Sequence, residues 1–146
     1  MTIYQISVFL ENRAGQLCEI TDILRKNQID LRAINIAETS DYGVLRLIAN
    51  DSQKASSLLL EQGFILSMTP VVAVAVNDEP GGLAKVLHLM ADANINIEYM
   101  YSVFGQSNGK AYMIFRVAQD EELKHVLQKN GIDVVSSEEM GLYETI

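Results

Sequence analysis

Residues 11–17 read Glu11-Asn12-Arg13-Ala14-Gly15-Gln16-Leu17, and residues 77–83 read Asn77-Asp78-Glu79-Pro80-Gly81-Gly82-Leu83. The two stretches align at an offset of 66 residues (81 − 15 = 66), with a glycine and a leucine at matched positions. The same offset pairs apolar residues further along the chain, such as Ile20 with Val86. Because this period exceeds the roughly 20–50 residues of solenoid repeats, it indicates that a whole domain was duplicated.

Each copy has the same order of predicted strands and helices around its aligned stretch, residues 11–17 or 77–83. An alternating, β-branched run before it predicts a strand, and apolar residues at helical spacing after it predict an amphipathic helix. Two strands joined by a turn, a second helix and a last strand complete each copy. The predicted strands are 3–10, 31–38, 44–49 and 64–68 in the first copy, and 71–76, 97–104, 111–118 and 134–136 in the second. The second helices are predicted to begin at Asp51 and Asp120.

The order of elements is therefore βαββαβ, twice. It predicts an α+β fold of two tandem ferredoxin-like domains, each with an antiparallel sheet and both helices on one face. Pro70 marks the expected junction, so the domains are predicted at 1–69 and 70–146. No stretch rich in Gly, Ser or charge separates them, and we expect them to touch.

Composition excludes several classes of function. The formal net charge is −8, and the 11 Lys and Arg residues are scattered, which is unlike a nucleic-acid binder or a protein of anionic membranes. No apolar run reaches the ~18 residues of a membrane span, and no signal peptide is recognisable. Cys18 is the single cysteine, which fits a reducing compartment. We therefore expect a soluble cytoplasmic protein. We also expect a homodimer, which is an ordinary way to cover the edges of a sheet.

The loop between the first strand and the first helix is the candidate functional element of each copy. Its glycines let a ligand approach the backbone, and the helix start suits a carboxylate. The acidic residues Asp78 and Glu79 suit an ammonium group, and together these features match a zwitterionic amino acid. A purely structural explanation stays open, because Pro-Gly before a helix is a common turn and duplication copies turns as well as sites.

The second copy resembles the ACT domain, through Asp78–Leu83, the helix after it, and the run Asn94–Tyr99 with the strand that continues to Ser102. The first copy is looser, because Ala14 stands where the second copy has proline, although the glycine and the leucine remain. The resemblance covers nearly the whole chain, as a tandem pair.

What the resemblance implies is a non-catalytic regulatory module that binds a free amino acid at an interface between ACT domains. No cofactor, metal ion or catalytic residue is implied. The ligand-facing positions carried over by the resemblance are Asn12, Arg13, Ala14, Gly15, Gln16 and Leu17 in the first copy, Asp78, Glu79, Pro80, Gly81, Gly82 and Leu83 in the second, and Asn35, Ile36, Ala37, Tyr101, Ser102 and Val103 on the second strands.

Three questions stay open at this point. Arg13 aligns with Glu79, so the two loops are not equivalent, and one could bind while the other only supports an interface. The chain could instead be a regulatory or assembly subunit of an amino-acid biosynthetic enzyme, with ligand binding secondary. Acylphosphatases share the βαββαβ order and use an arginine and an asparagine, which Arg13 and Asn35 could imitate, although a basic phosphate cradle is missing.

Overall fold

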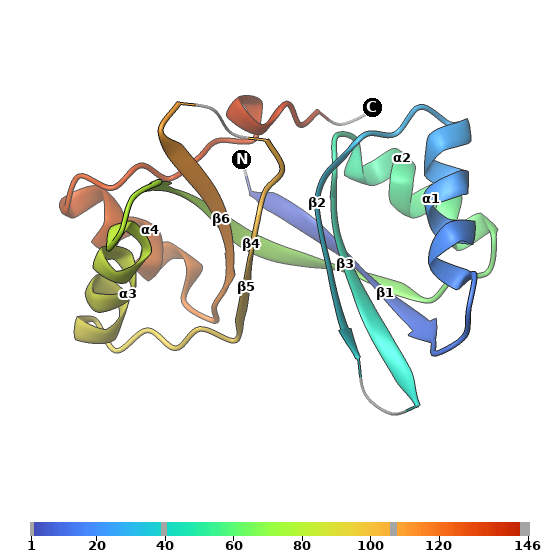
Figure 1. Ribbon diagram of the computed structural model, residues 1–146, viewed down its shortest axis with the longest axis horizontal. Helices are drawn as coiled ribbons and strands as arrows, with labels where there is room; N and C mark the ends of the chain where they lie inside the picture. Colours follow the sequence, from blue (N-terminus) through green and yellow to red (C-terminus); the bar gives the residue numbers. More distant parts are fainter. Residues whose placement is uncertain (1, 39–40, 106–107, 144–146) are drawn as a thin grey trace. The chain divides into compact units, whose positions relative to one another are not determined.

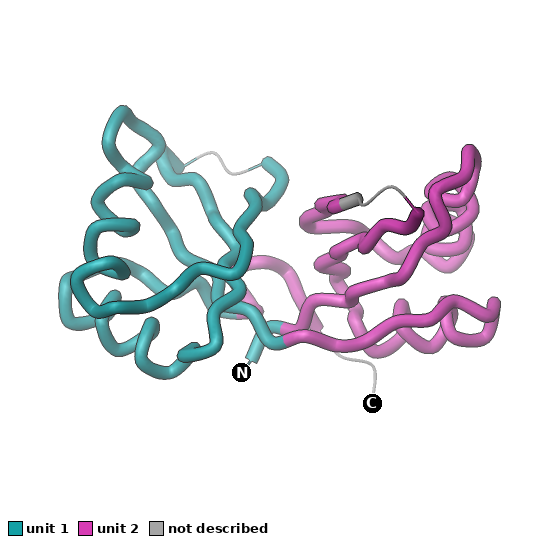
Figure 2. The backbone as a smooth tube through the Cα atoms, turned by 90° about the horizontal axis from the view of Figure 1, so that it is seen from below, with its two compact units in different colours: residues 1–3, 70–136 teal, residues 4–69, 137–146 magenta. Residues whose placement is uncertain are grey.

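The computed structural model describes residues 2–38, 41–105 and 108–143. The chain divides into two compact units, drawn in different colours in Figure 2. Unit 1 comprises residues 1–3 and 70–136, and unit 2 comprises residues 4–69 and 137–146. Each unit therefore contains most of one repeat together with a short terminal segment from the other half of the chain.

Unit 2 has the element order of the first repeat, with both helices on one face of its sheet (Figure 1). The strand order is β2-β3-β1-β4, and the β1–β3 and β2–β3 pairs are antiparallel. Its elements are β1 (Ile3–Glu11), α1 (Gln16–Lys26), β2 (Leu31–Glu38), β3 (Tyr42–Ala49), α2 (Ser52–Glu61), the start of β4 (Leu66–Asn77) and the 3-10 helix η1 (Glu138–Met140).

Unit 1 repeats this arrangement with the strand order β4-β6-β5, again antiparallel. Its elements are the rest of β4, α3 (Gly82–Asp92), β5 (Tyr99–Ser102), β6 (Lys110–Arg116) and α4 (Asp120–Lys129). Residues 133–135 run beside β4, where the Ala75 N–H donates to the Asp133 carbonyl (3.0 Å) and the Val135 N–H donates to the Ala73 carbonyl (2.8 Å).

Each unit has its own hydrophobic core between the sheet and the two helices. In unit 2, alternate residues of β1 such as Ile6 and Val8 pack against Ile20 and Leu24 of α1, and all four are at most 1% exposed. In unit 1, β4 and α3 supply the equivalent residues, such as Val74 and Met90. The period-2 pattern of the strands and the helical spacing of the helices both point into these cores.

The predicted α+β fold of two βαββαβ repeats is confirmed. The second helix of the first repeat begins as expected, since Asp51 caps it by accepting the Lys54 N–H (3.1 Å). In the second repeat the cap residue is Gln119, and Asp120 is instead the first helical residue. There its carboxylate still lies near the positive end of the helix dipole.

Two strand predictions were wrong around the repeat boundaries. The predicted strands 64–68 and 71–76 form one strand, β4, which runs straight through Pro70. Proline tolerates this position because its fixed φ is compatible with extended backbone, and its carbonyl accepts a bond from Arg116 (3.2 Å). The predicted last strand at 134–136 is reduced to a single bridge between Val74 and Val134.

The C-terminal segment belongs to unit 2, although the residues before it belong to unit 1. Met140 is 1% exposed, and its carbonyl accepts a bond from Arg32 (3.2 Å). The Tyr143 N–H donates to the Asn50 carbonyl at 2.7 Å. These contacts anchor the segment beside β2 and the end of β3, so it is an integral part of unit 2.

None of the helices in the described part of the chain is long and apolar enough to cross a bilayer.

Candidate functional site

The two strand–helix loops share the first part of their backbone geometry. In the first loop, which we call loop 1 (Glu11–Leu17), the Arg13 N–H donates to the Glu11 carbonyl at 2.9 Å. In the second, loop 2 (Asn77–Leu83), the bond from Glu79 to the Asn77 carbonyl has the same length. The duplication has therefore preserved the local geometry of the turn as well as the sequence pattern.

A glycine in the left-handed region caps the helix in each loop. Gly15 has φ 90° and Gly81 has φ 86°, and the helices α1 and α3 begin at the next residue. An L side chain is strained at such φ values, which explains why the pattern holds a glycine in both copies. The first N–H groups of a helix have no intrahelical partner, so each loop presents donors beside its glycine.

The residue after the capping glycine makes the two loops different. In loop 1 it is Gln16, which is 8% exposed and whose Oε1 accepts the Glu11 N–H at 2.7 Å. In loop 2 it is Gly82, where an added Cβ would lie 1.9 Å from the Asn77 carbonyl oxygen. Loop 1 is therefore held open by a side chain, whereas loop 2 closes with backbone directly against backbone.

An open pocket of about 80 Å³ lies over loop 1. Its lining residues come from the end of β1, the loop, the start of α1, β2 and β3: Leu10, Glu11, Asn12, Arg13, Gln16, Leu17, Ile36 and Gly43. Leu17 is 38% exposed and Ile36 is 52% exposed, so both leave apolar surface accessible at the pocket. The pocket thus combines apolar surface with a cation, a carboxylate and an amide.

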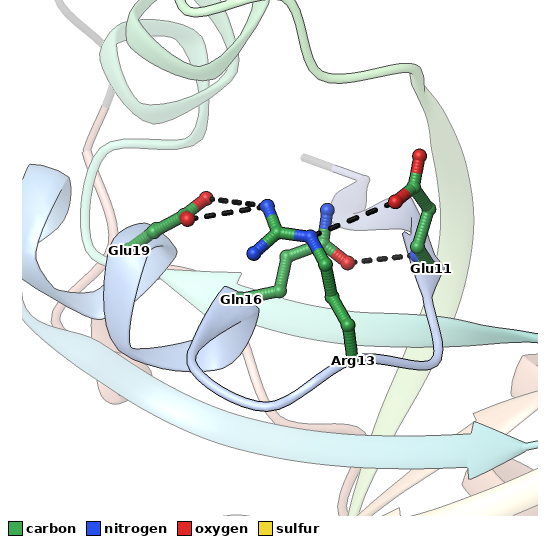
Figure 3. Close-up of polar contacts among 4 residues, drawn as sticks. All are labelled: Glu11, Arg13, Gln16 and Glu19. Atoms are coloured by element: carbon green, nitrogen blue, oxygen red, sulfur yellow. Dashed lines mark hydrogen bonds and ion pairs between the residues drawn. The ribbon is translucent and has the colours of Figure 1, made fainter.

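Arg13 is held in place by two carboxylates, as Figure 3 shows. Its Nη2 lies 3.1 Å from both carboxylate oxygens of Glu19, and its Nε lies 3.6 Å from Glu11. All three side chains are substantially exposed. The ion pairs therefore orient the guanidinium over the loop and add little to stability, since exposed pairs contribute about 0–1 kcal/mol.

We expect Arg13 to contribute little to the stability of the protein. Replacing Arg13 with alanine should change the free energy of unfolding by less than about 1 kcal/mol, because the ion pairs are exposed and screened by water. Urea unfolding followed by circular dichroism measures the change. A loss of several kcal/mol would mean that Arg13 supports the fold and is not a residue available for ligand binding.

The structure brings only part of the predicted first-copy set together. Asn12, Arg13, Gln16, Leu17 and Ile36 line the pocket, while Ala14, Gly15, Asn35 and Ala37 are not among its lining residues. The register explains the strand residues. Ile36 pairs with Leu45 on the face covered by the helices, whereas its two neighbours Asn35 and Ala37 point to the other face.

The same register argues against the acylphosphatase alternative. The Oδ1 of Asn35 accepts a bond from Arg46 at 3.0 Å, on the face opposite to the pocket. Arg13 lies at the pocket with the helix start. The two side chains that would have to act on one acyl phosphate therefore do not converge.

The predicted positions of the second copy lie differently. Tyr101 and Val103 are buried, at 7% and 8% exposure, whereas Ser102 between them is exposed. Ser102 is the counterpart of Ile36 in the repeat and pairs with Met113, a residue packed against the core of unit 1. It is thus the one of these three that shares the helix-covered face.

Loop 2 is braced by the neighbouring hairpin. The Asp78 N–H donates to the Gly109 carbonyl at 2.9 Å, and the Lys110 ammonium donates to the Oδ1 of Asn77. The Nδ2 of Asn77 in turn donates to Glu79 at 3.2 Å. The predicted residues Asp78, Glu79, Pro80 and Gly81 are exposed, and Gly82 and Leu83 are half-buried.

Three lining residues of the pocket were not predicted from the sequence. Glu11 belongs to the aligned stretch, and its place as the acidic end of the first strand was the available signal. Leu10 and Gly43 have no such signal, because their proximity depends on the antiparallel register that pairs them across β1 and β3. Only the folded sheet places Gly43 at the pocket.

Within the described ranges, no cluster of three or more His, Cys, Asp or Glu side chains could hold an ion. Cys18, in the first turn of α1, is exposed.

Comparisons with known proteins agree with this architecture. A family model described as an ACT domain pair matches residues 1–143. The crystal structure of protein BT0572 from Bacteroides thetaiotaomicron is 36% identical in sequence, covers 97% of this chain and 96% of its own, and superposes with a TM-score of 0.89.

More distant structures share the fold. The regulatory subunit of aspartate kinase from Thermus thermophilus, in its ligand-free form, is 17% identical over 87% of this chain and 91% of its own, with a TM-score of 0.64. The regulatory subunit from Thermus flavus is 16% identical over 88% and 92%, with a TM-score of 0.59. No curated protein sequence matched this chain.

Proposed function

Since this chain belongs to the family of ACT domain pairs, we propose that it is a non-catalytic regulatory protein that binds a free amino acid. Binding would act by shifting the population of conformations or assemblies, which requires a difference in affinity between those states. We further propose that the protein works in the cytoplasm, as a homodimer.

The pocket over loop 1 is the observation that carries this proposal. It places the guanidinium of Arg13, the carboxylate of Glu11 and the amide of Gln16 around one small volume. An amino acid presents a carboxylate and an ammonium group close together, so a site with both signs of charge suits it. At about 80 Å³ the pocket is far below the ~300 Å³ of sites for drug-sized ligands, which also fits a small metabolite.

A second candidate function is suggested by the structural neighbours. Two of them are regulatory subunits of aspartate kinase, so this chain could act as a regulatory or assembly subunit of an amino-acid biosynthetic enzyme, with ligand binding secondary. This second candidate predicts that an enzyme co-purifies with this chain. The catalytic rate of that enzyme, once separated from the chain, should change when the chain is added back without any amino acid.

A panel of thermal unfolding midpoints tests the main proposal. A ligand that binds only the folded state adds RT ln(1 + [L]/Kd), about 2.7 kcal/mol at a hundredfold excess over Kd. For domains of this size, such a gain raises the midpoint by several degrees. We expect one L-amino acid or a few related ones, at millimolar concentration, to produce this shift.

The D-enantiomers of the same amino acids are the matched control, because they have identical charge and composition. A shift that is equal for both enantiomers, or absent for every L-amino acid after ligand carried through purification has been removed, would contradict the proposal. The second candidate would then take precedence.

A further inference from the structure

The side-chain amide of Gln16 is bonded within loop 1 through its oxygen. Gln16 is 8% exposed, and its Oε1 accepts the Glu11 N–H at 2.7 Å. A backbone N–H can only donate, so the atom facing it must be the oxygen, and this fixes the amide orientation. Figure 3 shows the oxygen turned toward Glu11 and the nitrogen pointing away from it.

No residue in the described part of the chain pairs with the Nε2 of Gln16. Gln16 lines the pocket, so this amide offers its two N–H donors there. Among the described residues no buried side-chain nitrogen or oxygen lacks a partner, so this amide nitrogen is accessible from solvent, where a ligand can reach it. A carboxylate oxygen is the acceptor that suits this amide and the neighbouring guanidinium of Arg13.

The rest of the pocket indicates the kind of side chain that the ligand carries. Leu10 is 6% exposed, while Leu17 and Ile36 remain 38% and 52% exposed. These three aliphatic residues come from β1, α1 and β2, and together they line one pocket. A ligand with an aliphatic side chain would remove their exposed apolar surface from water, which is favourable.

We infer that loop 1 selects a small aliphatic L-amino acid such as valine or leucine, with its carboxylate at Gln16 and Arg13, its ammonium group at Glu11, and its side chain on Leu17 and Ile36. This inference rests on the proposed function and specifies the ligand class. Loop 2 does not duplicate the site, because glycine, glutamate and serine stand there in place of Gln16, Arg13 and Ile36.

Titration calorimetry of the intact protein tests the inference through the variant Gln16→Glu. Glutamate keeps an oxygen that can accept the Glu11 N–H, so the loop conformation is maintained, but it replaces the amide donor with an acceptor of negative charge. A lost hydrogen bond to a charged group weakens binding about tenfold or more. Gln53→Glu is the matched control, since Gln53 is exposed on α2 of the same unit, and it should bind like the wild type.

The choice of ligand tests the aliphatic preference. Valine should bind about tenfold or more tightly than threonine, its hydroxyl-bearing isostere, and also more tightly than lysine or aspartate, because the apolar lining offers no polar partner. Ile36→Ser, which copies the residue of the second repeat, should reduce this preference.

The possible outcomes test the ligand class and the proposed function separately. Binding of valine or leucine that Gln16→Glu weakens about tenfold or more supports both the ligand class and the proposed function. A charged or hydroxylated amino acid that binds in preference to valine overturns the ligand class while leaving the proposed function intact. Binding unaffected by Gln16→Glu overturns the assignment to loop 1, and a protein that binds no amino acid contradicts the proposed function itself.

Discussion

Gly82→Ala should destabilise the protein by about 3 kcal/mol, the upper end of the cost of overpacking a folded structure. An added Cβ would lie 1.9 Å from the carbonyl oxygen of Asn77 and 2.9 Å from its carbonyl carbon. Both are backbone atoms, so loop 2 would have to open to relieve the overlap. Hydrogen exchange should locate the loss in unit 1, at the start of α3.

Gly81→Ala is the informative comparison, because Gly81 has the unusual backbone angle and Gly82 does not. At Gly81, with φ +86°, an added Cβ meets nothing within 4 Å. The cost should therefore be limited to the strain of the left-handed conformation, about 1–2 kcal/mol. Urea unfolding of both variants measures the difference. An equal or larger loss for Gly81→Ala would mean that loop 2 is not closed in the way described.

Met140→Ala should cost about 2–4 kcal/mol, as expected for truncating a fully buried methionine. Met140 is 1% exposed in the C-terminal segment, which belongs to unit 2. The cavity left behind would weaken the anchorage of the segment beside β2 and β3. Amide exchange should accordingly accelerate at Asn50 and Tyr143.

Tyr143→Phe supplies the control for the same segment. It removes only a long hydrogen bond between the tyrosine hydroxyl and Asn50 (3.4 Å) on an exposed side chain, and it leaves the backbone bond at Tyr143 in place. Its effect should be below about 1 kcal/mol. Equal effects of the two substitutions would indicate that the side chain of Met140 is not buried in the folded protein.

Local patterns in the sequence were sufficient to predict the repeat, the order of elements and the loops. Strand and helix periods appear in each copy, and the matched glycines of the two loops occupy matched left-handed caps. The continuity of β4 was not predicted, because Pro70 reads locally as a breaker. The burial of Met140 was not predicted either, because it depends on contacts with residues about a hundred positions earlier.

The candidate site could likewise be predicted from the sequence only in part. Arg13 and Gln16 were named because they stand in the aligned loop, but the role of Gln16 as the side chain that holds loop 1 open depends on its bond to Glu11. A glutamine at the first position of a helix reads as a solvated residue from sequence alone. Which strand residues reach the loop was also undecided, since neighbouring residues point to opposite faces and only the register selects Ile36.

A titration of the isotope-labelled protein with L-valine, followed through its backbone amide resonances, tests whether loop 1 binds the amino acid. We expect the largest chemical-shift changes at loop 1, residues 11–17, and at Ile36, with smaller changes at loop 2. No change anywhere across a titration to millimolar concentration, in protein freed of carried-over ligand, would contradict binding of this amino acid. Changes centred on residues 77–83 would contradict the assignment of the site to loop 1.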